Sequence, residues 1–246
     1  MRLGIISDIH ANIEALEVSF KALEAAGCEE YFCLGDVVGY GASPKECIKF
    51  IRDRNIRCVL GNHDKYVTDD CDEWPIKQYA QDAILWTRSV LDQDDISWLK
   101  SLPIKIDAYG ATFLHASLDD DIDLTWPYIL DSNSAGRHFF FQTSKVCFFG
   151  HVHIPLIFTL GDQGTVGLEL LRSCSLEKDS NKKYLLNVGS IGQPRDSDRR
   201  ASSVMFDSET FDVRLVRVEY DIPETQRKII NAGLPELLAT RLSSGK

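Results

Sequence analysis

Short apolar runs alternate with amphipathic segments over the first part of the chain, and this pattern constrains the fold more than any other feature. The runs at residues 3–7, 31–34 and 56–60 have the length and composition of buried strands. Residues 12–26 place their apolar side chains on one helical face, and the capping box Ser-Pro-Lys-Glu at residues 43–46 begins a second helix that reaches about residue 54. This strand–helix–strand–helix–strand order predicts a parallel sheet with right-handed crossovers.

The rest of the chain contains two further helical segments, at about residues 74–91 and 94–100, followed mainly by strands. Strands are predicted at residues 111–114, 146–149, 156–160, 166–171, 184–188, 203–207 and 211–220, and the tail is helical from Pro223. We find no repeat and no linker rich in Pro, Gly or Ser, so residues 1–246 are expected to form a single domain. This α/β domain would have two packed sheets with helices outside, a helical insertion at about residues 70–102 and a C-terminal helix at about residues 223–242.

Composition narrows the classes of function and location. The formal charge of −10 counts against a broad nucleic-acid-binding surface, although two bound dications would locally supply about four positive charges for a small phosphate substrate. The seven cysteines form no CxxC pair, which is typical of reduced, buried thiols. The N-terminus lacks the apolar region of a signal peptide, and no apolar stretch of about 18 residues is present. We therefore expect a cytoplasmic protein that does not enter the membrane.

Polar side chains follow five of the predicted strands, at the point where each strand ends. Asp8 and His10 follow the first strand, Asp36 the second, and Asn62, His63 and Asp64 the third; His115 follows residues 111–114, and His151 and His153 follow residues 146–149. Five of the six histidines thus occupy such positions, and His138 is the exception. In open α/β sheets, ligands bind just beyond the carboxyl ends of the strands.

Each of these segments has an ordinary structural interpretation when it is taken alone. Asp-x-His after a strand can be a polar turn, and Gly61-Asn62-His63-Asp64 can be a tight turn. Gly150-His151-Val152-His153 is more specific, because alternate residues of an extended chain point the same way. Together they supply seven candidate metal ligands with nitrogen and oxygen donors: Asp8, His10, Asp36, Asn62, His115, His151 and His153. Such donors suit divalent cations, and a pair of cations can acidify a shared water and bind a phosphoryl oxygen.

These motifs, in this order, resemble those of the calcineurin-like metallophosphoesterase superfamily. The resemblance implies a four-layer αββα sandwich of two mixed sheets, with one ion bound by Asp8, His10, Asp36 and His153 and the other by Asp36, Asn62, His115 and His151. It also implies that His63 protonates the leaving oxygen while Asp64 orients its ring. This division is chemically reasonable, because a general acid must keep a proton that a metal would displace.

The segment after Gly35-Asp36 differs from the protein Ser/Thr phosphatase branch, which carries Asp-Arg-Gly there. Here the residues are Val-Val-Gly-Tyr-Gly, and with the motif at residues 187–195 they resemble the small prokaryotic phosphodiesterase-type branch. Arg195 is then a candidate phosphate ligand, or else a surface side chain paired with Asp196 or Asp198. Tyr40 could contact the substrate or be a loop aromatic, and Asn12 could belong to the site or cap the following helix.

The function expected from this resemblance is dimetal-dependent hydrolysis of phosphate esters on small or nucleotide-like substrates, as a phosphodiesterase or phosphatase. A hydroxide bridging the ions would attack phosphorus, with His63 as general acid. The ions would be Mn, Fe, Zn, Ni or Mg, with Mn favoured. Two alternatives remain open: a catalytically silent binding or scaffold protein of the same fold, and a nuclease. The residues leave open the oligomeric state, the metal, and the choice between monoester, diester, cyclic nucleotide and dinucleoside polyphosphate.

Overall fold

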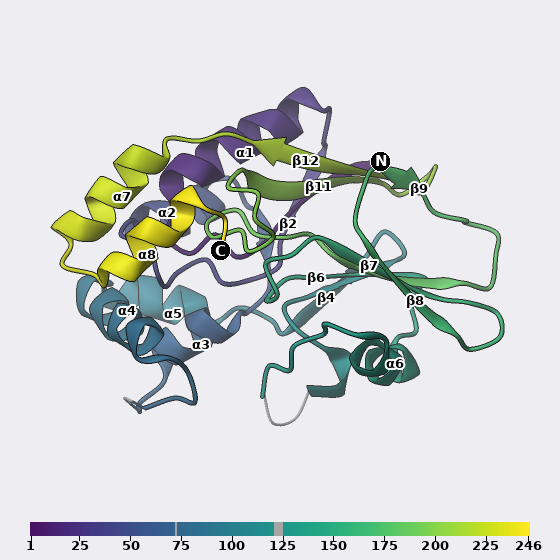
Figure 1. Ribbon diagram of the computed structural model, residues 1–246, viewed down its shortest axis with the longest axis horizontal. Coiled ribbons are helices and arrows are strands. Elements are labelled where there is room, and N and C mark those ends of the chain that lie inside the picture. Colours follow the sequence, from purple (N-terminus) through teal and green to yellow (C-terminus); the bar gives the residue numbers. More distant parts are fainter. Residues whose placement is uncertain (72, 121–124) are drawn as a thin grey trace.

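The computed structural model describes residues 1–71, 73–120 and 125–246, and over these residues the chain forms two mixed six-stranded sheets (Figure 1). The first sheet contains β1 (Arg2–Ile6), β2 (Glu30–Cys33), β3 (Arg57–Cys58), β9 (Cys174–Ser175), β11 (Ala201–Asp207) and β12 (Asp212–Val218), in the order β3-β2-β1-β11-β12-β9. The second contains β4 (Lys105–Ala108), β5 (Ala111–Leu114), β6 (Val146–Phe149), β7 (Leu156–Leu160), β8 (Val166–Leu170) and β10 (Lys183–Asn187), in the order β4-β5-β6-β10-β7-β8.

Helices cover the outer faces of both sheets. The first sheet lies under α1 (Ile13–Ala25) and α2 (Pro44–Asp53), whereas α6 (Ser132–Phe141) lies on the second sheet (Figure 1). The remaining helices are α3 (Asn62–Thr68), α4 (Gln78–Val90), α5 (Gln93–Lys100), α7 (Ile222–Asn231) and α8 (Glu236–Thr240), with 3-10 turns η1 (Leu118–Asp120) and η2 (Arg241–Ser243). No helix in the described part of the chain is both long enough and apolar enough to cross a membrane.

The central strands are apolar on both faces because each face meets a different layer. In β6, Phe148 packs between the two sheets, whereas the next residue, Phe149, packs against the layer of α6. In β2, Phe32 likewise lies between the sheets and stacks on Phe113 with ring centroids 3.9 Å apart, while Cys33 faces the helices of the first sheet. Alternate side chains of a strand point to opposite faces, so a strand buried on both sides reads as a continuous apolar run. The expected four-layer αββα sandwich is confirmed.

Parallel pairing at the centre of each sheet brings the strand ends together. β1, β2 and β3 are parallel, as the sequence predicts, and β5, β6 and β10 are parallel in the other sheet. The carboxyl ends of β1 and β2 therefore lie at one end of the first sheet, and hydrogen bonds from His115 to the Leu34 carbonyl and from the His151 N–H to Asp8 place those of β5 and β6 close to them. The backbone N–H of Gly150 donates to the carbonyl of His115, which joins the loops that follow β6 and β5.

Several elements differ from the sequence-based expectations. The third strand has two residues, and α3 begins directly at Asn62 because Gly61 takes the N-cap position. The sequence analysis missed α6, whose cap is Asp131 bonded to Ser134, and also missed the edge strands β4 and β9. The expected single C-terminal helix at 223–242 is wrong: Gly233, at a φ of +71°, ends α7, and α8 begins after Pro235.

Candidate metal centre

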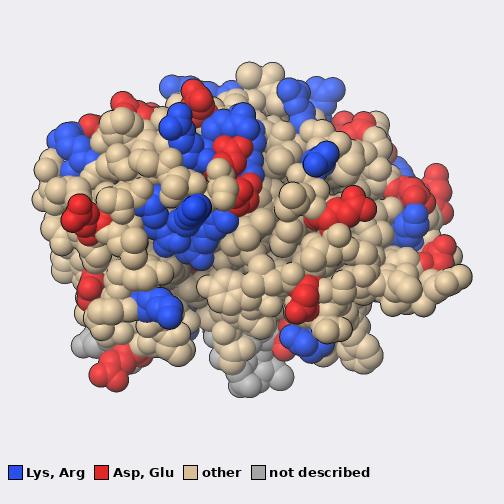
Figure 2. Space-filling view, in the orientation of Figure 1, with Lys and Arg blue, Asp and Glu red and all other residues tan. Residues whose placement is uncertain are grey.

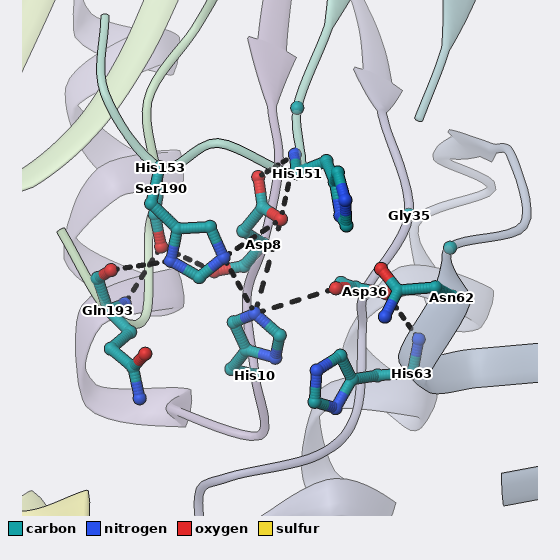
Figure 3. A network of polar contacts seen from close by, with 12 residues as sticks. Asp8, His10, Gly35, Asp36, Asn62, His63, His151, His153, Ser190 and Gln193 are labelled. Carbon is teal, nitrogen blue, oxygen red and sulfur yellow. Dashed lines mark hydrogen bonds and ion pairs between the residues drawn. The ribbon is translucent and has the colours of Figure 1, made fainter. Parts of the chain in front are cut away.

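Seven polar side chains converge where the loops after β1, β2, β5 and β6 meet the first turn of α3 (Figure 3). They are the seven candidate ligands named from the sequence: Asp8, His10, Asp36, Asn62, His115, His151 and His153, and each is at most 6% exposed. The Nε2 atom of His153 lies 3.3 Å from Asp8 Oδ1. Asp36 lies between two rings, because its Oδ2 atom is 3.6 Å from His10 Nε2 and 3.4 Å from His115 Nε2. Asn62 Oδ1 lies 3.0 Å from His115 Nε2, which brings the first turn of α3 into the cluster.

The backbone at these positions is unusual. Five of the seven residues have a positive φ: 52° at Asp8, 48° at His10, 53° at Asp36, 67° at His151 and 63° at His153. Non-glycine residues adopt this left-handed region uncommonly, and backbone strain of this kind collects at functional sites. The sharp turn after each strand directs its side chain into the cluster. Hydrogen bonds then hold these side chains in place; for Asp8, the backbone N–H of His151 donates to both carboxylate oxygens at 3.1 Å.

Hydrogen bonds from the far side of each ring define which nitrogen faces the cluster. Nδ1 contacts a backbone carbonyl in His10 (Val38, 3.1 Å), His115 (Leu34, 2.7 Å) and His153 (Gln193, 2.6 Å). Carbonyl oxygens only accept, so Nδ1 carries the hydrogen, and in the neutral ring Nε2 keeps its lone pair. His151 is reversed, because its Nε2 donates to the Trp126 carbonyl at 2.9 Å and leaves Nδ1 as the donor atom for a ligand. Such second contacts fix the tautomer of metal-binding histidines.

The charges of the cluster are unbalanced without a cation. Burial alone would raise the pKa of the Asp8 and Asp36 carboxyls, but His153 and His115 outweigh it and hold the pKa of both groups below the ordinary range. Burial disfavours the charged form of His115, yet the Asp36 carboxylate more than offsets it and raises the pKa of that ring to about 9. Burial lowers the pKa of His10 and His153 and takes that of His151 to about 3. His10, His151 and His153 are thus neutral beside two ionised carboxylates, and His115 would release its proton on binding a cation; this donor set fits divalent cations.

His63 lies beside this cluster on α3 and faces the same space. Its ring centroid is 4.9 Å from that of His10 and 4.4 Å from that of Tyr40, and its backbone N–H donates to Asp36 Oδ1 at 2.8 Å. The Nδ1 atom of His63 is buried and has no hydrogen-bond partner among the residues that the structure describes. A Cβ on Gly39 would stand 2.5 Å from this atom, so glycine at that position gives the ring its room.

Asp64 does not orient His63, and that expectation is wrong. Its Oδ1 accepts from the Val38 N–H at 3.1 Å and its Oδ2 accepts from the Gly61 N–H at 3.2 Å. Asp64 therefore binds the backbone N–H of the N-cap residue of α3 and ties this helix to the loop after β2. Burial, followed by the Asp36 charge, raises the pKa of the Asp64 carboxyl to about 7.

A cleft of about 490 Å³ opens over the cluster, and Arg195, Tyr40, His63, Asn62 and His151 are among its lining residues. The alternative in which Arg195 pairs with its acidic neighbours is wrong, because Asp196 pairs with Arg217 and Asp198 with Arg200. Arg195 instead donates through Nη2 and Nε to the Gln193 Oε1 atom, at 2.8 and 3.3 Å. Its guanidinium carbon lies 5.9 Å from the centroid of the Tyr40 ring.

Asn12 does not contribute a free polar group to the cleft. Its Oδ1 accepts from the Ala15 N–H at 3.1 Å and so caps α1, while its Nδ2 donates to the Gly192 carbonyl at 3.1 Å. The side chain is 1% exposed. The expected contact of Asn12 with substrate is therefore corrected to the capping role that was the alternative.

Two supporting residues escaped the sequence analysis. Gln193 binds the ring of His153 through its carbonyl and the guanidinium of Arg195 through its side chain, and Trp126 binds the ring of His151 through its carbonyl. The two contacts with histidine rings use main-chain carbonyls, which any residue type could supply, so the sequence could not reveal them. Gln193 lies within a motif that the sequence analysis singled out, and that position was the available signal.

The structure is a two-sheet sandwich that gathers histidine and carboxylate side chains at strand ends, and three comparisons with known proteins agree on the class of protein that this defines. The profile of the calcineurin-like phosphoesterase superfamily domain matches residues 1–210. A crystal structure of a metallophosphoesterase from Sphaerobacter thermophilus superimposes with a TM-score of 0.85 at 35% identity, over 100% of this chain and 99% of that one. An uncharacterized protein of Methanocaldococcus jannaschii is 38% identical over 99% of this chain and 98% of its own. The chain belongs to the calcineurin-like phosphoesterase superfamily.

A more distant similarity concerns part of the chain. The symmetrical bis(5′-nucleosyl)-tetraphosphatase of Actinobacillus pleuropneumoniae is 30% identical over 133 residues, which is 51% of this chain and 48% of that enzyme.

Proposed function

We propose that this protein is a metal-dependent hydrolase of phosphate esters. The observation that carries the proposal is the convergence of seven buried side chains with nitrogen and oxygen donor atoms beneath an open cleft. Asp8, His10, Asp36 and His153 would hold one ion, and Asp36, Asn62, His115 and His151 the other, with Asp36 shared. Membership of the phosphoesterase superfamily supports the same reaction class.

Two divalent ions, when bound here, would supply an activated water and neutralise the charge of the phosphoryl group. The distance data support Asp36 as the shared ligand, because its carboxylate lies between the rings of His10 and His115. We favour Mn²⁺ because carboxylate and amide oxygens suit harder cations and imidazole also accepts Mn²⁺.

Arg195 would bind the phosphoryl group of the substrate, and His63 would protonate its leaving oxygen. The Arg195 fork can donate two hydrogen bonds to phosphoryl oxygens, and its contact with Gln193 fixes its direction in the cleft. Burial, aided by the charge of Arg195, lowers the pKa of His63 to about 4 in the free protein. A bound phosphate brings negative charge next to the ring and raises this pKa, so His63 gains its proton together with the substrate.

The substrate is proposed to be a small phosphate ester. The net charge of −10 counts against the continuous basic surface that a sequence-independent nuclease uses, and on the face shown in Figure 2 acidic side chains interrupt the group of Lys and Arg side chains. The partial similarity to a bis(5′-nucleosyl)-tetraphosphatase supports a nucleotide-like substrate over a phosphoprotein. The absence of the Asp-Arg-Gly segment after Asp36 points in the same direction.

Turnover of bis-p-nitrophenyl phosphate and p-nitrophenyl phosphate tests the proposal. Chelator-stripped protein should be inactive, and adding Mn²⁺ should restore hydrolysis of at least one ester. Asp36→Asn should abolish the restored activity, whereas Asp162→Asn, an exposed change on the β7–β8 turn, should retain it. If metal-loaded protein cleaves neither ester nor any natural phosphate ester, the chain is a binding or scaffold protein. Selective cleavage of single-stranded DNA would instead support the nuclease.

A further inference from the structure

The cleft above the metal centre is lined by an unusual number of aromatic rings. Five come from four parts of the chain: Tyr40 after β2, Tyr66 in α3, Tyr79 in α4, and Trp126 and Tyr128 before α6. The described lining residues also include the cations Arg195 and Lys77 and no Asp or Glu, although the whole chain has a net charge of −10. This part of the surface therefore favours a ligand that combines negative charge with a flat apolar group.

Tyr128 has the geometry of a stacking platform rather than of a core residue. Its ring lies on that of His151, with centroids 4.2 Å apart and an interplanar angle of 27°, so one face is covered by a proposed metal ligand. The side chain is nevertheless 51% exposed, whereas the buried aromatics of the sheet core, such as Phe148, are 0% exposed. An aromatic side chain held on one face and open to solvent can stack a second planar ring, and such stacking contributes to nucleobase binding.

The position of this ring relates it to the reacting phosphate. His151 belongs to the metal cluster, and Tyr128, which stacks on its ring, lines the same cleft as Tyr40 and Arg195. A group stacked on Tyr128 would therefore be separated from phosphorus by a short linker, as a base is separated from its phosphate by a ribose.

Building on the proposed function, we propose that this cleft selects nucleoside phosphates, with the base stacked on Tyr128 and the charge met by Arg195. The stacking contact would select the organic half of the ester, and the reaction at phosphorus would be the hydrolysis proposed above.

A matched pair of substrates isolates the contribution of the base. Adenosine 5′-phosphate and methyl β-riboside 5-phosphate have the same phosphate, the same ribose and the same 5′ leaving oxygen, and both can be used as monoesters and as methyl diesters. With Mn²⁺-loaded protein, we expect kcat/KM to be at least about tenfold higher for the adenosine compounds, as one stacked base would give. A ratio near one in both ester forms overturns the inference.

Variants at one position then assign the effect to the ring. Tyr128→Phe keeps the stacking face and should keep the ratio, whereas Tyr128→Leu should bring it close to one. Tyr109→Leu, at an exposed tyrosine in the β4–β5 turn, is the control and should retain the wild-type ratio. An unchanged ratio in Tyr128→Leu overturns the assignment to this residue, and if that variant fails to fold, the wild-type ratio still decides the substrate class. Failure of the proposed function is separately visible as no metal-dependent hydrolysis of bis-p-nitrophenyl phosphate.

Discussion

The Nε2 atoms of His10 and His153 face each other 3.1 Å apart, although both rings are buried and both use Nδ1 to donate to a backbone carbonyl (Figure 3). In their neutral forms the two rings direct lone pairs at each other, which is unfavourable unless a positive charge lies between them. The carboxylates of Asp8 and Asp36 lie beside this pair. The donor atoms of these four side chains therefore form a set that fits a divalent cation, which leads to the first prediction.

His153→Ala should reduce the metal content of Mn²⁺-saturated protein from two ions to about one per chain, because Asp36, Asn62, His115 and His151 remain. Activity on bis-p-nitrophenyl phosphate should fall by more than about 100-fold, since loss of a supporting contact alone often costs 10–100-fold. Elemental analysis after gel filtration gives the stoichiometry. Asp162→Asn should retain both ions; a full complement of metal in His153→Ala would contradict the ligand assignment.

His63→Gln should lower kcat/KM most for esters whose leaving group has a high pKa, because such a leaving group must be protonated as it departs. General acid catalysis contributes about 10²–10⁴-fold, so alkyl esters should lose activity within that range, whereas p-nitrophenyl esters should lose far less. The measurement is kcat/KM over a series of esters with leaving groups of increasing pKa. Equal losses across the series would show that His63 positions the substrate but does not protonate it.

Asp64→Asn should lower stability without changing this leaving-group dependence. The substitution leaves at most one acceptor for the N–H groups of Val38 and Gly61, and one unsatisfied buried donor costs about 1–3 kcal/mol. Thermal unfolding should show the lower Tm, while the ester series should retain the wild-type slope. If Asp64→Asn instead showed the same dependence of kcat/KM on leaving-group pKa as His63→Gln, Asp64 would orient the ring of His63 after all.

Gln193→Met should raise KM by roughly tenfold while leaving kcat and metal content nearly unchanged. The variant removes the acceptor that directs Arg195, and hydrogen bonds to charged groups contribute about 1.5–3 kcal/mol. The main-chain carbonyl that binds His153 is still present, which makes metal content the internal control. Arg195→Met and the double variant complete the cycle; fully additive effects would mean that Gln193 and Arg195 act independently.

His138 should make the protein acid-labile independently of the metal centre. It is 0% exposed, its Nδ1 accepts from the Leu118 N–H at 3.2 Å, and burial lowers its pKa to about 4. Between this value and the unfolded value of about 6.5, the unfolded chain binds a proton that the folded chain does not. The stability conferred by the neutral ring is thus complete above about pH 6.5 and is lost as the pH falls towards 4, by up to about 3 kcal/mol.

His138→Asn keeps an acceptor for Leu118 but does not titrate. Its free energy of unfolding should therefore decrease less steeply than that of the wild type between pH 6.5 and 4, whatever its stability at neutral pH. Denaturant unfolding at several pH values measures the two slopes. Parallel slopes would show that the folded protein accommodates a charged ring at this position.

Local sequence patterns predicted much of the fold. The first three strands and two helices were predictable because apolar periodicity and the proline at the first position of α2 agree with the tertiary arrangement, although the Ser43 side chain makes no capping hydrogen bond. The start of α3 was missed because Gly-Asn-His-Asp is equally suited to a turn, and its cap depends on Asp64 reaching back to Gly61. α6 was missed because Asp131 and Ser134 are a weak start signal before a segment containing Gly136.

The sequence by itself determined which residues could form the site, because residue type and position at strand ends are both one-dimensional properties. Only the tertiary structure decided how they act. In the structure, Asp64 accepts from backbone N–H groups, and Asp196 and Asp198 pair with arginines other than Arg195. Tyr128 stacks on the ring of His151. These outcomes depend on contacts between segments far apart in the chain and on left-handed turns at Asp8, Asp36 and His153. Such turns are unfavourable locally, so packing from the rest of the fold must hold them.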